Sequence, residues 1–143
     1  MGYMLQLDVR GMPNLSWMRS MPRFSVLTHD HPFLHWDFLL ETGESCRTWR
    51  LHSPPDSGGE IIAEQLPDHR LIYLTYEGPV SGNRGTVRLW DAGTYEAITN
   101  NTSELRVKLC GHNLTGIAHI STSGDGSCRW TLHRDSADSP FNL

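Results

Sequence analysis

The sequence predicts an all-β domain: a closed or nearly closed antiparallel β-barrel of about eight strands, with at most one or two short helices. Short apolar and β-branched runs recur along the chain, and loops rich in Gly, Pro and Asn separate them. A length of 143 residues is that of one domain. A barrel is favoured because closure pairs the edges of many short strands.

Nine candidate strands follow one another along the chain, each short and rich in β-branched or aromatic residues. They read FSVLTH, LHWDFLLE, CRTWRL, EIIAEQL, RLIYLTYEG, GTVRLWDAG, ELRVKLCG, LTGIAHIS and CRWTLHR, with turn-rich loops such as SPPDSGG, GPVSGNRG and SGDGS between them. We therefore expect a β-domain over residues 23–134. It is flanked by an N-terminal segment, 1–22, in which only 12–21 is expected to form a short helix, and by a C-terminal tail, 135–143.

Charge and composition exclude several classes of protein. The formal charge of −4 gives no general attraction to a polyanion, so a phosphate-containing substrate has to be held by local contacts. No stretch approaches the roughly 18 apolar residues of a membrane span, and the N-terminus MGYMLQLDVRG lacks the pattern of a secretory signal. We expect a cytoplasmic protein with no membrane partner. Three cysteines without a CxxC pair argue against a disulfide framework or a cysteine zinc site.

The run THDHPFLHWDFLLE combines strand-like residues with good metal ligands. Residues two apart in a strand project from the same face, so His35 and Asp37 point together. On the same reasoning, Leu34, Trp36 and Phe38 are expected to face the core. The alternation therefore separates side chains suited to binding from side chains suited to packing.

A hairpin between FSVLTH and LHWDFLLE places His29 opposite His35, with Asp37 beside them. Two imidazoles and one carboxylate leave open positions on an ion and suit Mn²⁺, Fe²⁺ or Zn²⁺. On spacing alone, ordinary hydrogen-bonded histidines are the more frequent outcome. His69 and Tyr73, four residues apart in DHRLIYLTYEG, read by themselves as a strand histidine and a core tyrosine.

Several ordered blocks resemble the 3′-phosphoesterase domain of DNA ligase D. That family carries HD, four residues and HYDFRLE, followed by KSW, and the run RFSVLTHDHPFLHWDFLLETGESCRTW is similar. Its EDHPLDYxxFEG resembles PDHRLIYLTYEG, and its GAGTVxxWDxGTW resembles RGTVRLWDAGTY. ELRVKLCGHNLTG and the later RWTL match its last strands. The resemblance spans about residues 23–134.

The resemblance implies a site and an activity. His29, His35 and Asp37 are expected to hold a catalytic Mn²⁺, with another divalent metal such as Zn²⁺ as the alternative. His69 is expected to contact the scissile phosphate from the opposite side, and Tyr73 to add a hydrogen bond. The family removes a terminal ribonucleoside and then the 3′-phosphate from DNA, leaving a 3′-OH for a polymerase or ligase, so a separate ligase or polymerase is an expected partner.

The match fails at three basic positions. Leu39 stands where the family has the arginine of HYDFRLE, and a leucine cannot replace a planar bidentate donor. HSPP at 52–55 replaces a lysine-containing PKGP, and EIIA at 60–63 replaces an arginine-containing KRLAV. The sequence therefore predicts an intact metal site with weakened phosphate binding.

Other side chains are candidates for supporting roles. Glu41 lies on the same strand face as His35 and Asp37 and is a candidate acceptor for an imidazole N–H. Arg50 is expected to face the same way as His52 and is a candidate substrate ligand. Further arginines that loops could bring in are Arg70, Arg84, Arg88, Arg129 and Arg134.

Three functional hypotheses follow. The first is a metal-dependent phosphoesterase acting on a nucleic-acid 3′ end or on a smaller phosphate ester. The second, supported by the missing anchors, is a catalytically weakened module that binds a metal or a DNA end. The third is a metal-dependent enzyme of different chemistry, because the fold does not fix the function.

Overall fold

A computed structural model describes residues 21–135. The predicted helix within 12–21 and most of the segments 1–22 and 135–143 lie outside this range. Nine strands and one 3-10 helix make up the fold. They are β1 (Arg23–His29), β2 (His35–Thr42), β3 (Ser45–Leu51), β4 (Ile61–Arg70), η1 (Leu71–Leu74), β5 (Gly78–Pro79), β6 (Thr86–Asn100), β7 (Glu104–Gly111), β8 (Thr115–Thr122) and β9 (Cys128–Arg134).

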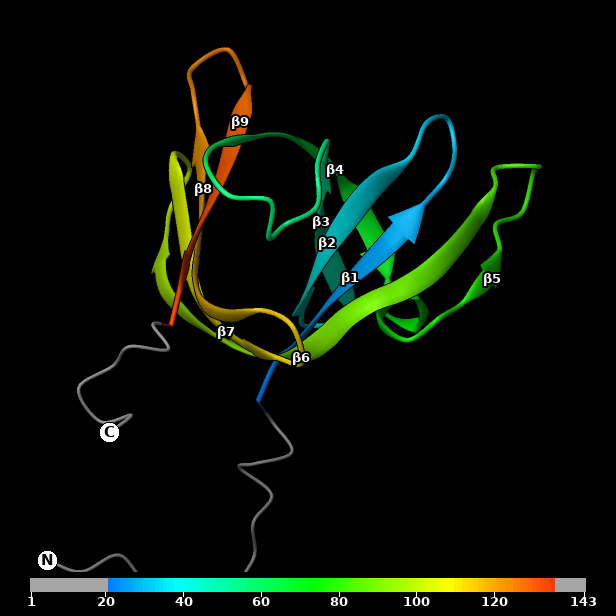
Figure 1. The fold of residues 1–143 in the computed structure, drawn as a ribbon, viewed down its shortest axis with the longest axis horizontal. Coiled ribbons are helices and arrows are strands. Elements are labelled where there is room, and N and C mark those ends of the chain that lie inside the picture. The colour runs from blue at the N-terminus through cyan, green and yellow to red at the C-terminus, as the bar shows by residue number, and fades with distance from the viewer. Residues whose placement is uncertain (1–20, 136–143) are drawn as a thin grey trace, which may run out of the picture.

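Eight of the strands form a closed ring of antiparallel hydrogen-bonded pairs. The order is β1-β2-β3-β4-β9-β8-β7-β6, and β6 then pairs with β1 (Figure 1). The two-residue strand β5 adds to the start of β6. The predicted fold class is therefore confirmed: the described chain is nearly all β, and η1 is its one short helix.

The long strand β6 closes the ring. Its first part, residues 87–94, pairs with β1, and its second part, residues 93–100, pairs with β7. The sequence predicted only the first part as a strand, because GTVRLWDAG ends at a glycine. Gly93 instead lies inside the strand, where a Cβ would come within 2.0 Å of the Cys110 carbonyl oxygen. The glycine thus allows close backbone approach rather than ending the strand.

The interior of the ring is the main hydrophobic core. Alternate residues of the strands point inward, as the pleat of a strand requires. Phe38 of β2 packs edge-on against Trp130 of β9 with ring centroids 4.9 Å apart, and both are fully buried. Trp130 Nε1 donates a hydrogen bond to the carbonyl of Pro55 at 3.1 Å, so its polar edge is satisfied.

A second, smaller apolar cluster covers the outside of β1, β2 and β6. Its buried members are Leu27, Leu39, Cys46, Leu74 and Val87. Burial raises the pKa of the Cys46 thiol to about 11. Cys46, Cys110 and Cys128 are all free thiols.

The outer cluster explains where one strand prediction was wrong. RLIYLTYEG was expected to form a strand, but Leu71–Leu74 is the 3-10 helix η1. Side chains three apart eclipse in a 3-10 turn, so Leu71 and Leu74 both reach the outer cluster. An apolar segment that covers a neighbouring face does not have to alternate apolar and polar residues as a strand does. For this reason, the hydrophobic pattern of the sequence led to the wrong prediction of a strand.

Asp91 fastens the turn between β7 and β8. Its buried carboxylate accepts the backbone N–H groups of His112, Asn113 and Leu114 at 2.9, 3.1 and 2.8 Å. A Cβ at Gly111 would lie 2.5 Å from this carboxylate and 2.6 Å from the ring of Phe24. Asp91 of the Trp-Asp pair in β6 therefore has a structural role.

Both ends of the described chain leave the ring at one level. Arg23 pairs with Thr94, Thr94 with Cys110, and Cys110 with Thr115. The N–H of Asp135 donates to the carbonyl of Thr115 at 3.1 Å. In Figure 1 this level lies toward the bottom of the view, whereas the β1–β2 and β5–β6 turns lie toward the top. Between residues 21 and 135, no helix is long and apolar enough to cross a membrane.

Candidate metal centre

The β1–β2 hairpin brings three potential ligands together. His29 pairs directly with His35 across the hairpin, as the sequence predicted, and Asp37 follows two residues later on the same face. One ligand atom from each lies within 4.8 Å of the other two. Two ligands on one ion are separated by roughly 3 to 4.5 Å when each bond is about 2.0 to 2.2 Å long. The spacing is therefore compatible with a shared cation.

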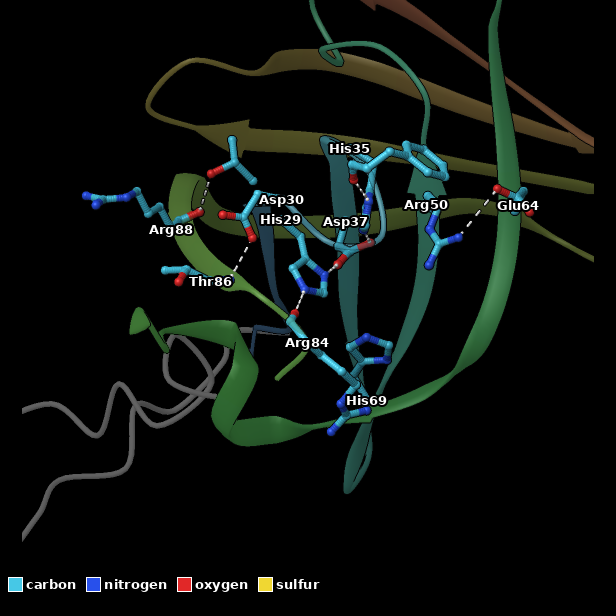
Figure 2. A network of polar contacts seen from close by, with 12 residues as sticks. His29, Asp30, His35, Asp37, Arg50, Glu64, His69, Arg84, Thr86 and Arg88 are labelled. Atoms are coloured by element: carbon cyan, nitrogen blue, oxygen red, sulfur yellow. Dashed lines mark hydrogen bonds and ion pairs between the residues drawn. The ribbon is translucent and has the colours of Figure 1, made fainter. Parts of the chain in front are cut away.

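The Asp37 carboxylate lies between the two imidazoles (Figure 2). Its Oδ2 is 3.4 Å from Nδ1 of His29, and its Oδ1 is 3.1 Å from Nε2 of His35. The two rings stand 4.9 Å apart at 62°. His35 is fully buried and Asp37 is 3% exposed, so the protein shields this contact from bulk water.

Backbone carbonyls fix the tautomer of both histidines. Nε2 of His29 donates to the carbonyl of Arg84 at 2.7 Å, and Nδ1 of His35 donates to the carbonyl of Phe33 at 2.8 Å. The remaining nitrogen of each neutral ring then presents a lone pair toward Asp37. Sequence analysis missed these two acceptors because backbone atoms leave no residue signature.

Two buried polar atoms of the cluster face each other without a hydrogen-bond partner. Nε2 of His35 and Oδ1 of Asp37 are buried and make no hydrogen bond, although they lie 3.1 Å apart. A neutral Nε2 and a carboxylate are both acceptors and repel each other, so this close approach requires a proton or a cation between the two atoms. A divalent cation would satisfy both atoms, and the donor set suits one.

The electrostatics keep the carboxylate ionised. Burial raises the pKa of Asp37, but the neighbouring imidazoles of His29 and His35 outweigh it and lower the pKa to about 2. The Asp37 carboxylate in turn raises the pKa of His29, because it stabilises the protonated imidazole. The cluster therefore offers a negative ligand at neutral pH.

Asp30 locks a neighbouring turn against the hairpin. Its Oδ1 accepts the N–H of Thr86 at 2.7 Å. Gly85 has a φ of +77°, and a Cβ there would lie 2.2 Å from the same oxygen. This packing holds the carbonyl of Arg84 against His29. Asp30, which follows His29 in the sequence, is thus a positioning residue. The sequence alone did not indicate this role.

A cavity of about 580 Å³ opens beside the three ligands. His69 and Tyr73 line it, with ring centroids 5.9 Å apart. Nδ1 of His69 donates to the carbonyl of Pro67 at 3.0 Å, which leaves Nε2 for another partner. The structure thus gathers all five residues that the sequence placed at the centre of the site: His29, His35, Asp37, His69 and Tyr73.

Comparison with known proteins decides the family. Residues 27–121 match the family model of the DNA ligase D 3′-phosphoesterase domain. The chain belongs to this family. The multifunctional non-homologous end joining protein LigD of Pseudomonas aeruginosa is 30% identical over 108 residues, which cover 68% of this chain and 13% of that protein. The chain thus corresponds to a small part of that relative, and membership of the family suggests a phosphoesterase role.

The cavity of this 3′-phosphoesterase domain is cationic although the whole chain is acidic. Arg50, Arg70 and Arg84 line it, against the carboxylates of Asp37 and Asp68. The local charge therefore opposes the formal net charge of −4 and suits an anionic ligand.

The cavity arginines are held in different ways. Nε of Arg84 donates to the carbonyl of Ser81 at 2.7 Å, and its NH2 group donates to Ser81 Oγ at 3.1 Å. In Figure 2 the side chain of Arg84 extends toward His69. Arg50 lies 5.4 Å from the ring centre of Phe33 and 3.9 Å from the carboxylate of Glu64.

The other arginines considered from the sequence do not line the cavity. Arg129 lies 3.9 Å from Glu60, and Arg134 donates to the carbonyl of Asn113 at 3.1 Å. Arg88 is exposed on β6, one residue beyond the buried Val87. Sequence position could not separate these arginines from Arg50, Arg70 and Arg84.

Two expectations about the hairpin strands were wrong. Glu41 accepts no imidazole proton: its carboxylate binds the backbone N–H and the guanidinium of Arg23 at 2.9 to 3.2 Å. Six strand residues separate it from His35, or roughly 20 Å. Leu34 does not face the core but is 57% exposed, because it belongs to the turn before β2 begins.

Leu39 does not leave an open position at which a phosphate could bind. It occupies the place of a family arginine, yet it is fully buried in the outer cluster and packs with Leu27 and Val87. An arginine there would have to displace apolar neighbours. The change from arginine to leucine therefore fits a repacked surface next to the candidate ligands.

Proposed function

We propose that this chain is a metal-dependent phosphoesterase that removes a 3′-phosphate or a 3′-ribonucleoside from nucleic-acid ends. One observation carries the proposal: His29, His35 and Asp37 converge with free ligand atoms at the edge of a cationic cavity that His69 and Tyr73 also line. Family membership supports a phosphoesterase role. The metal and the substrate are the parts that the proposal adds.

His29, His35 and Asp37 would hold the metal, for which Mn²⁺ is our first choice and Zn²⁺ the alternative. When bound, a divalent ion neutralises charge on phosphoryl oxygens and lowers the pKa of bound water. The carbonyls of Arg84 and Phe33 keep both imidazoles turned toward Asp37. The chain's own contribution is therefore a preset ligand geometry.

His69 and the arginines would act on the phosphate. In both reactions a bond forms from water oxygen to phosphorus. Removal of a 3′-phosphate breaks the bond from phosphorus to the 3′ oxygen, removal of a 3′-ribonucleoside breaks the bond from phosphorus to the 5′ oxygen of that ribonucleoside, and the leaving oxygen takes a proton. A protonated His69 would donate from Nε2, because its Nδ1 is already bound to Pro67. Arg84 and Arg70 would bind the non-bridging oxygens, and Tyr73 would add a hydrogen bond from its hydroxyl.

A direct assay tests the proposal. Protein with Mn²⁺ and a DNA primer ending in a 3′-phosphate or a single ribonucleotide should yield a primer with a 3′-OH. Asp37→Ala and His35→Ala should both abolish the product, and Glu41→Gln, outside the cavity, should not. Equal inertness of the wild type and Asp37→Ala on every such end would refute catalysis.

The alternative is a catalytically weakened module that binds a metal or a DNA end. The burial of Leu39, where the family has an arginine, favours it. Under this alternative the wild type still binds Mn²⁺ through His29 and still binds a 3′-phosphorylated end, but it releases no product. A separate ligase or polymerase is the partner that either function would serve.

A further inference from the structure

Phe33 is an exposed aromatic residue attached to the candidate metal centre. It lies in the turn before β2 and is 44% exposed. Its carbonyl orients the imidazole of His35, and its ring centre lies 5.5 Å from that of His35. Single exposed apolar residues are ordinary on protein surfaces. Phe33 differs because both its backbone and its ring touch a predicted ligand.

The ring of Phe33 is held from the side of the cavity. Arg50, which lines the cavity, places its guanidinium 5.4 Å from the ring centre. His52 approaches the ring at 5.5 Å and is itself bound to Glu64 at 2.6 Å. These contacts restrain the ring while nearly half of the residue stays accessible. A restrained, accessible aromatic ring is suited to stacking against a planar group.

We propose that Phe33 is a stacking surface for the base of the 3′-terminal nucleotide. The inference rests on the proposed function, in which a phosphate occupies the space between the metal ligands and His69. One sugar separates a 3′-phosphate from its base, so a phosphate beside His35 brings that base to the edge where Phe33 lies. Arg50, between the cavity and the ring, is placed to contact the sugar-phosphate backbone.

The proposal sets the substrate class. Stacking is tolerant of base identity, because every base offers a π-face. We therefore expect single-stranded or frayed nucleic-acid ends of any sequence to bind, and small phosphate esters without a ring to bind poorly. The chain as a whole is acidic, so affinity for the end has to come from local contacts.

The test compares two single-stranded oligonucleotides that end in a 3′-phosphate, one with a normal terminal base and one with an abasic terminal sugar. Binding to the full chain is measured by fluorescence anisotropy in Mn²⁺, with a non-hydrolysable 3′-phosphonate in place of the 3′-phosphate so that no turnover occurs. The wild type should bind the base-bearing end more tightly. Phe33→Ala should weaken that binding by about 5- to 100-fold and leave the abasic end unaffected.

Matched variants separate stacking from general apolar contact. Phe33→Trp should retain the preference for the base-bearing end, whereas Phe33→Leu should lose most of it. Leu34→Ala, which truncates the adjacent and more exposed side chain, should bind like the wild type. Circular dichroism of each variant checks that the hairpin still folds.

Several outcomes would overturn the stacking surface. Equal affinity of the wild type for both ends, or an unchanged preference in Phe33→Ala, would assign the exposed ring to another contact, such as a protein partner. Failure of the proposed function looks different: the wild type would hydrolyse no 3′-phosphate with Mn²⁺ while Phe33→Ala still weakened binding of the base-bearing end.

Discussion

The carbonyl oxygen of Arg84 accepts a hydrogen bond from Nε2 of His29 at 2.7 Å. One residue therefore orients a predicted metal ligand through its backbone while its side chain lines the adjacent cavity. The two roles can be separated by mutation, because a side-chain substitution leaves the carbonyl in place.

Arg84→Ala should weaken substrate binding without weakening metal binding. Loss of a charge-assisted contact to phosphate should raise KM by roughly 10- to 100-fold, measured with a 3′-phosphorylated primer and Mn²⁺. The Mn²⁺ affinity, measured by calorimetry, should not change. Arg88→Ala, an exposed arginine outside the cavity, is the matched control. A fall in Mn²⁺ affinity in Arg84→Ala would show that the turn itself had moved.

Asp37→Asn should remove most of the metal affinity. The variant loses the negative ligand and keeps the size of the side chain. Mn²⁺ should raise the Tm of the wild type by several degrees, because a ligand that binds only the folded state stabilises it. The Tm of Asp37→Asn should not respond. Asp68→Asn, a carboxylate in the same cavity but outside the cluster, should respond like the wild type.

The stability of the metal-free protein should depend on pH through Asp37. Its pKa is lowered from 3.8 to about 2 in the folded state, so its stabilising contribution is present above about pH 4 and is lost as pH falls toward 2. The shift corresponds to about 2 kcal/mol. Urea denaturation of the wild type and Asp37→Asn at a series of pH values measures the difference. Parallel curves for the two proteins between pH 5 and 2 would contradict this.

In the same series of urea denaturations, the stability of the metal-free protein should also depend on the ionisation of His29. Its pKa is raised in the folded state, so its contribution is present below the unfolded pKa of 6.5 and is lost as pH rises through the raised folded value. Because Asp37 is the largest cause of the raised pKa, this loss should be smaller in Asp37→Asn.

Restoring the family arginine at Leu39 should damage the fold rather than improve the site. Leu39→Arg would bury an unpaired charge in the outer cluster, which costs about 3–5 kcal/mol of unfolding free energy. Leu39→Met should cost less than about 1.5 kcal/mol, because it nearly conserves volume. Denaturant unfolding compares them. A Leu39→Arg variant of normal stability and raised turnover would mean that the position opens toward the phosphate after all.

Asp91→Ala should destabilise the protein although Asp91 lies outside the cavity. The substitution leaves three backbone N–H groups without their acceptor, which should cost at least about 3 kcal/mol. Asp125→Ala provides the control: Asp125 also accepts a backbone N–H, from Ser127, but on an exposed turn. Its Tm should scarcely change.

The two-residue repeat of hydrophobic and polar residues was sufficient to predict the orientation of a side chain wherever that side chain simply faced one side of a regular strand. The pairing of His29 with His35 followed from the length of the intervening turn and the two-residue repeat. The same rule failed at Leu71–Leu74, where an apolar run turns to cover a neighbouring surface. It also failed for Glu41, because sharing a face says nothing about distance along the strand.

Features that depend on backbone atoms or on long-range closure were not accessible from the sequence. The carbonyls that orient His29 and His35 carry no residue signal. Whether Arg84 reaches the cavity depends on how the β5–β6 turn docks against Asp30. The burial of Leu39 depends on an outer cluster that draws on strands distant in the chain and on η1.

Arg23 and Asp135 leave the ring at one level, linked across the sheet through Thr94 and Thr115, while His29 lies at the far end of β1. Anything joined to the chain before Arg23 therefore starts about 20 Å along β1 from the candidate ligand His29. A tether attached next to Arg23 is therefore separated from the β1–β2 turn, with His29 and Phe33, by the length of β1.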